Sequence, residues 1–355
     1  MRPLTLVARY RAAVAAGGGV ALAAIVGLST AAAQVDAQAA RTMVQSTLAL
    51  SDRDAAALEQ GRAVVKTLPG TSKREVTTAG AVRISASAAD FVAQFRTLEG
   101  FKRSSFIKQI ARFSDPPRLA DLDALELEDD DVAALKACRV GDCDVRLPGS
   151  DIHRFAREID WRSSDARRRA TILYKSLLLG YLADYRRAGI ESLVAYDDRR
   201  TPTRLAAETL DLLAQQRSLL DHVPQFRHYL LQFPRASLPR TEDFFYWSKE
   251  AFGFRPVIGL NHVSLHTTDR GEVVIVTTQI YASHYMDGQM GGNLLVPVAG
   301  ARNRPAFYWL YFNRARIDNL EGILGTLSRP IIQRRARSGL ARSMTDSKQR
   351  MEAAR

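Results

Sequence analysis

The sequence predicts an α+β protein in which a curved antiparallel sheet grips a long C-terminal helix, with a helical insertion in the middle. Residues 75–85 and 257–268 alternate apolar and polar side chains with the period of strands, and a β-branched run over 272–285 and an aromatic run over 306–314 favour further strands. Residues 150–235 carry apolar stripes at helical spacing. At 46% hydrophobic and 25% charged residues, the composition is that of a globular protein. The 355 residues are enough for one large domain with an insertion.

Residues 1–33 have the layout of a secretory signal peptide. Three arginines and no acidic residue precede an uncharged apolar run over 12–28, and small residues end at Ala33 in an A-x-A arrangement. We therefore expect a periplasmic or secreted protein, cleaved after Ala33 in preference to a second A-x-A at 37–39. The alternative is an uncleaved membrane anchor.

The chain is strongly basic, with a formal net charge of +12. In a cytosolic protein this charge would suggest nucleic acid as the partner. Export makes that partner unexpected, so we expect no nucleic acid. Anionic lipid head groups are the more plausible opposite charge.

The two cysteines, Cys138 and Cys143, flank a short loop that contains Gly141. In an oxidising compartment this spacing favours a structural disulfide. Four intervening residues do not match the C-x-x-C redox motif, and two thiols without nearby histidines do not make a zinc site.

The first part of the mature chain is expected to run from a tether or helix into a sheet. Residues 34–60 are the tether or helix, and 61–119 hold a hairpin followed by two helices. The hairpin spans 61–85 with a Pro-Gly turn, and Ser87 caps the first helix. The second helix is expected from Ser104 to the prolines at 116–117.

Residues 120–240 are expected to form the helical insertion. Seven acids crowd 121–131, and we interpret them as opening a helix through Leu135, because their spacing does not fit a calcium loop. A long helix is predicted from Ser164 to Gly189, and a second amphipathic helix over 205–220.

Residues 241–355 are expected to complete the sheet and end in a helix. Strands are predicted over 257–268, 272–285, 293–298 and 306–314, with a flexible glycine-rich loop at 288–292. The last strand is apolar on both faces, so both faces of the sheet should be covered. The final helix is expected to begin at Ser328 and Pro330. It shows one apolar stripe: Ile332, Ala336, Leu340 and Met344.

This order of elements resembles the START-like, or Bet v 1-like, helix-grip superfamily. Four blocks carry the resemblance: 75–85, 87–113, 257–314 and 326–351. The central insertion departs from it. The resemblance implies an apolar cavity between the sheet and the last helix. Members bind lipids and other hydrophobic molecules, and some are cyclases or hydrolases, so the fold alone does not select one activity.

Three strand histidines are the candidate acid–base groups: His262, His266 and His284. His262 and His266 share a strand face, where four residues span about 13 Å. That is too long for one ion with bonds of about 2 Å, so no metal is expected. Candidate ligand contacts are aromatic: Trp247, Tyr281, Tyr285, Trp309 and Tyr311.

The sequence leaves three classes of function open. The first is an exported protein that binds a hydrophobic small molecule or lipid, without a cofactor. The basic C-terminal helix would then make peripheral contact with an anionic membrane surface. The alternatives are an enzyme of the same fold that uses a strand histidine, and a structural or interaction protein of the cell envelope.

Overall fold

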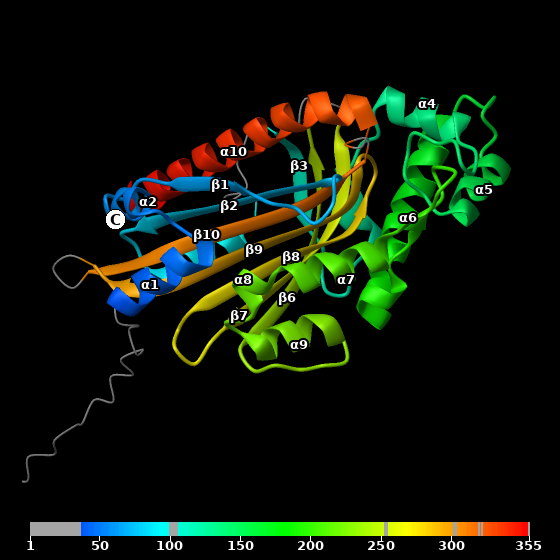
Figure 1. Cartoon of the computed structure of the whole chain (residues 1–355). Helices are drawn as coiled ribbons and strands as arrows, with labels where there is room; N and C mark the ends of the chain where they lie inside the picture. Colours follow the sequence, from blue (N-terminus) through cyan, green and yellow to red (C-terminus); the bar gives the residue numbers. More distant parts are fainter. Residues whose placement is uncertain are drawn as a thin grey trace, which may run out of the picture. The chain divides into compact units, whose positions relative to one another are not determined.

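An eight-stranded antiparallel sheet forms the centre of the structure, a computed structural model that describes residues 37–98, 106–251, 255–300, 304–318, 320 and 322–353 (Figure 1). The predicted signal peptide lies outside the described residues. The strand order is β1-β2-β10-β9-β8-β7-β6-β3. The bounds are β1 Val64–Leu68, β2 Glu75–Ile84, β3 Ile107–Arg112, β6 Thr241–Glu250, β7 Val257–Thr267, β8 Val273–Ala282, β9 Met286–Ala299 and β10 Pro305–Ile317. The predicted fold class, with a curved sheet, a C-terminal helix and a helical insertion, is confirmed.

One face of the sheet, the α10 face, carries helices α3 (Ala88–Arg96) and α10 (Gly322–Ala353). Helix α10 packs against β1 and β2, and its Met344 is fully buried. The contact is close, because a Cβ atom on Gly80 of β2 would lie 2.8 Å from the sulfur of Met344. Of the predicted apolar stripe, Met344 and Leu340 therefore pack on this face of the sheet.

The opposite face, the insertion face, is covered by helices from the middle of the chain and by α1 (Figure 1). Helix α6 packs against β8, α7 against β9, and α1 against β9 and β10. The prediction that both faces are covered is confirmed. The helix bounds are α1 Ala37–Leu48, α2 Asp52–Glu59, α4 Asp129–Ala137, α5 Gly149–Glu158, α6 Ala166–Ala188, α7 Leu205–Gln215, α8 Arg217–Leu220 and α9 Pro224–Gln232.

Most of the predicted elements are present with small shifts in their ends. β1 and β2 form the expected hairpin, Ser87 caps α3, and three acids open α4. The final helix differs at its start. It begins at Gly322 rather than Ser328, so Pro330 lies inside it. None of the described helices is long and apolar enough to cross a membrane.

The predicted second helix after Ser104 is wrong. Its described part is strand β3, which pairs antiparallel with β6 at the edge of the sheet. Phe106, Ile107, Ile110 and Phe113 fit a helical spacing, but pairing with β6 satisfies this backbone and overrides the local pattern.

The predicted flexible loop at 288–292 is also wrong, because these residues lie inside β9. Glycine serves close packing here. A Cβ atom on Gly288 would lie 3.2 Å from Leu212 of α7, and one on Gly292 only 2.3 Å from Leu219 of α8. These two glycines let the insertion helices approach the strand.

Candidate ligand-binding site on the α10 face

Aromatic side chains gather at one end of the α10 face. The ring centroids of Phe91 and Trp309 lie 5.0 Å apart, and those of Phe91 and Phe307 lie 5.7 Å apart. Phe95 of α3 lies 6.4 Å from Phe244 of β6. All five rings belong to one buried cluster that also includes Met344. This end of the face is a continuous apolar wall.

Hydrogen-bonding side chains follow directly along the same strands. Asn293 of β9 accepts a 2.9 Å bond from Trp309 Nε1, and Tyr311 lies opposite Asn293 on β10. One row further, the strand register aligns Thr277, Gly291 and Asn313. Gln289 Nε2 donates to Asn313 Oδ1 at 3.0 Å. Amide, hydroxyl and phenol groups thus border the aromatic wall.

The polar rows are not sealed, although they lie on interior strands of the sheet. Thr277, Gly291, Tyr311 and Asn313 are partly exposed. A Cβ atom on Gly291 would make ordinary van der Waals contacts of 3.9 Å with Thr277, Asn313 and the Phe312 carbonyl, so these residues are immediate neighbours. Helix α10 packs on β1 and β2, next to β10. A ligand here would meet an apolar wall at one end and hydrogen-bonding groups at the other.

The structure separates the predicted ligand contacts. Trp309 and Tyr311 share the α10 face, with ring centroids 6.5 Å apart. Tyr281 and Trp247 instead lie on the insertion face, where Tyr281 donates to the Arg146 carbonyl at 2.8 Å and Trp247 to the Asp121 carbonyl at 2.8 Å. These two do not join Trp309.

Tyr285 lies elsewhere again, between β8 and β9, with a positive φ of 57°. It borders an open polar hollow of about 470 Å³ together with charged side chains. The other residues that line this hollow are Lys108, Glu128, Asp130, Arg255 and Pro256.

Sequence reasoning missed Asn293, Asn313, Gly291 and Thr277 as site residues. A detectable signal was present, since polar residues and glycine interrupt otherwise apolar strands. The prediction of a loop at 288–292 hid Gly291. Thr277, Asn293 and Asn313 lay in predicted strands, but the sequence did not give the register that places them in neighbouring rows.

His262 lies on the insertion face, in a buried polar network that includes Ser264. Its Nε2 donates to Asp243 Oδ1 at 2.7 Å, and Tyr185 of α6 bonds to its Nδ1 at 3.0 Å. Ser264 donates to Asp243 Oδ1 at 2.7 Å, and Tyr229 of α9 donates to Oδ2. The network therefore ties α6 and α9 to β6 and β7.

The charge at the centre of this network is well compensated. Burial by itself raises the pKa of Asp243, but hydrogen bonds from His262, Tyr229 and Ser264 outweigh it, and the net pKa lies below the ordinary value.

In a nucleophile–histidine–carboxylate relay, the carboxylate and the nucleophile hold opposite ring nitrogens. Here Asp243 and Ser264 both approach Nε2 of His262, so the geometry is not that of the relay.

The other two histidines are also packed into the protein. His266 bonds to Thr241 Oγ1 at 3.0 Å and stacks on Phe226, with ring centroids 5.4 Å apart. Burial, reinforced by Arg240, lowers the pKa of His266. Among the residues that the structure describes, no cluster of His, Cys, Asp and Glu could hold a metal ion.

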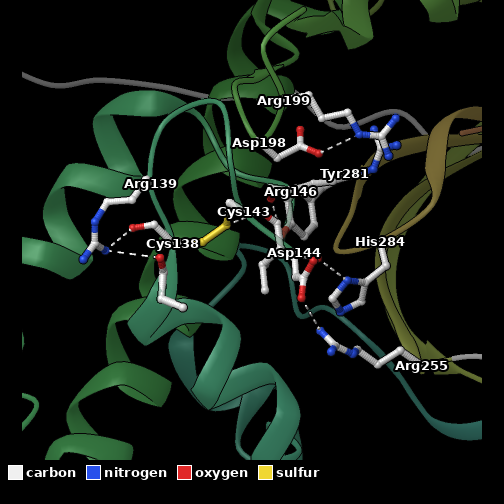
Figure 2. Close-up of a disulfide and its surroundings, with 12 residues drawn as sticks. Cys138, Arg139, Cys143, Asp144, Arg146, Asp198, Arg199, Arg255, Tyr281 and His284 are labelled. Atoms are coloured by element: carbon white, nitrogen blue, oxygen red, sulfur yellow. Dashed lines mark hydrogen bonds and ion pairs between the residues drawn. A yellow bond between two sulfur atoms is a disulfide. The ribbon is translucent and has the colours of Figure 1, made fainter. Parts of the chain in front are cut away.

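Figure 2 shows the surroundings of the disulfide between Cys138 and Cys143, which follows α4. His284 Nδ1 donates to the Asp144 carbonyl at 2.7 Å, and its Nε2 lies 3.1 Å from Asp131 Oδ1. Arg146 is buried and bonds to Asp287 and Asp318 at 2.7 and 2.9 Å. The disulfide loop is thus attached to the end of the sheet, and His284 holds it there.

No protein-family model matches this chain, and no curated protein matches it. The candidate site therefore stands on its own geometry.

Proposed function

We propose that this protein binds a hydrophobic ligand or lipid in the cell envelope, on the α10 face of its sheet. The observation that carries the proposal is the accessible row of Thr277, Gly291 and Asn313 beside the buried aromatic wall. A solvent-accessible polar row in the middle of a sheet, next to clustered aromatic rings, suits an amphiphilic molecule.

The arrangement of the sheet supports the START-like, helix-grip resemblance. The first long strand, β2, pairs with the last, β10, so the insertion between β3 and β6 does not interrupt the sheet order. Helices α3 and α10 lie on the same face as Trp309 and Tyr311. The proposed ligand would lie between this face and α10.

The outer face of α10 supports a second part of the proposal, peripheral contact with an anionic membrane. Arg334, Arg335, Arg337 and Arg342 are exposed, and among the described residues none of them has an acidic partner. Ile331 beside them is 56% exposed. Basic side chains around an exposed aliphatic residue favour an anionic lipid surface as the occupant. Membrane contact would place the ligand site near the membrane, which would be the source of a lipid ligand.

Export to the envelope is the third part of the proposal, and α1 favours one of the two cleavage sites. Ala40 and Val44 of α1 are fully buried. Cleavage after Ala33 leaves this helix whole, whereas cleavage after Ala39 would remove its first turn.

The experiment is native mass spectrometry of the protein purified from its own host. We expect a co-purifying lipid on the wild type and its loss from Gly291→Leu, whose bulky side chain would cover the polar groups of Thr277 and Asn313. Ile172→Ser, at an exposed position of α6, is the control and should retain the lipid. A wild-type protein that carries no lipid and takes up none from added envelope extract would refute ligand binding and favour the structural role.

A further inference from the structure

We infer that the ligand carries an uncharged, oxygen-rich head group, as in a monoacylglycerol, rather than a carboxylate or a phosphate. The inference rests on the proposed ligand site and names the class of molecule that the site would select. It depends on which atoms of the polar rows are already bonded and on the charge of those rows.

The side-chain amides of the polar rows on β9 and β10 have N–H groups that make no hydrogen bond within the described part of the protein. Asn293 uses Oδ1 to accept from Trp309, and Asn313 uses Oδ1 to accept from Gln289. Among the described residues, neither Nδ2 has a partner, and the Thr277 hydroxyl has none either. Asn293 is 4% exposed, and Asn313 and Thr277 are partly exposed, so a bound ligand would replace water at these donors. Ester, ketone and hydroxyl oxygens on a ligand would accept from these donors.

The rows themselves contain no carboxylate, ammonium, guanidinium or imidazole group: they consist of Thr277, Gly291, Asn293, Asn313, Gln289 and the phenol of Tyr311. Transfer of a carboxylate or phosphate from water into such a site is costly without a cationic partner. An uncharged head group avoids this cost and still satisfies the amide donors. The neighbouring wall of Phe91, Phe307 and Trp309 would take the acyl chain.

One cation lies towards the same end of the sheet. Arg329 of α10 donates from Nη1 to the carbonyl of Glu75, at the start of β2, at 3.4 Å. Among the described residues, no group bonds to its buried Nη2. Arg329 is therefore the side chain through which an anionic head group could be recognised instead, and the test includes it.

The test is a competition between 1-monooleoylglycerol and oleate, two probes with the same acyl chain and different head groups. The delipidated full-length mature protein is mixed with equimolar amounts of both, and native mass spectrometry measures the occupancy of each. We expect at least tenfold preference for 1-monooleoylglycerol. We expect Asn313→Leu to reduce that preference about fivefold or more, the effect of losing one hydrogen bond of about 1 kcal/mol.

Thr277→Val removes a different donor with little change in shape and gives a second measurement if Asn313→Leu does not fold. Equal or tighter binding of oleate would overturn the head-group inference while leaving ligand binding intact. If Arg329→Gln then abolished oleate binding, the head-group site would belong to Arg329. Binding of neither probe, with no native lipid on the protein, would instead overturn the proposed function.

Discussion

Leu219 of α8 lies against Gly292 of β9 so closely that a Cβ atom on this glycine would be 2.3 Å from Leu219 Cδ2. The preceding residue, Gly291, points to the other face, where its Cβ would meet nothing closer than 3.9 Å. Two adjacent glycines therefore have different roles. Gly292 admits a helix of the insertion, whereas Gly291 lies in the partly exposed row of the candidate ligand site.

This difference predicts opposite effects of the same substitution. Gly292→Ala should lower the free energy of unfolding by about 1–3 kcal/mol, because overpacking forces α8 away from the strand. Gly291→Ala should leave it unchanged or raise it by about 0.5–1 kcal/mol, since glycine is unfavourable within a strand. Urea unfolding of both variants measures the effects. Equal losses of stability would contradict the assignment of the two faces.

Burial of His266 predicts a pH dependence of stability. Its folded-state pKa is lowered, so the protein is most stable when the His266 ring is neutral. This contribution to the free energy of unfolding is fully present above the unfolded pKa of about 6.5 and is lost as the pH falls through the folded pKa. The free energy of unfolding should therefore fall between pH 7 and pH 5, and His266→Gln should reduce that slope. His153→Gln, at an exposed position of α5, is the control and should keep it. If His266→Gln left the slope unchanged, His266 would not be a source of the pH dependence of stability.

Asp243 predicts a loss of stability at lower pH. Its folded pKa lies below the ordinary value, so its contribution is present above about pH 4 and disappears as the pH falls through the folded pKa. Asp243→Ala should destabilise the protein by about 3–5 kcal/mol at pH 7, because Tyr229, Ser264 and His262 lose their shared acceptor. The difference from wild type should shrink below pH 4. Thermal melts of both proteins across this pH range measure the difference in stability. A difference that stays constant with pH would contradict the role assigned to Asp243.

Helix α10 predicts separate effects for its two faces. Met344→Ala should cost about 2–5 kcal/mol, because the side chain is fully buried against β2. Arg337→Glu should leave stability nearly unchanged, because the side chain is exposed, but should weaken binding to anionic vesicles. Vesicle sedimentation at low and physiological salt measures that binding. Unchanged vesicle binding would remove the proposed membrane role of Arg337 without affecting the fold.

The disulfide predicts a stability that depends on redox conditions. Closing the six-residue loop between Cys138 and Cys143 should stabilise the protein by about 2 kcal/mol. The double variant Cys138→Ser, Cys143→Ser should lose this amount and become insensitive to reductant. Thiol titration of the unfolded, unreduced wild type should find no free thiol, and two free thiols would refute the bond in the mature protein.

Local patterns in the sequence were sufficient for much of this fold. The hairpin of β1 and β2, the Ser87-capped α3, the long α6 and the apolar stripe of α10 were all predictable, because each depends on periodicity and capping within a few residues of chain. The apolar pattern on both sides of β10 also indicated correctly that the sheet is covered on both faces.

Tertiary structure alone decided which side chains share a face. Strand β3 exists because β6 pairs with it, and the glycine-rich run belongs to β9 because α7 and α8 pack against it. The register between β7 and β8 shifts at Leu260 and Asn261, so simple alternation cannot place Tyr281. A strand exposes alternate residues to opposite faces, so one bulge reverses the assignment of every residue beyond it. That is why Trp309 and Tyr281 lie on opposite faces, and why Asn293 and Asn313 became visible as site residues only in the folded sheet.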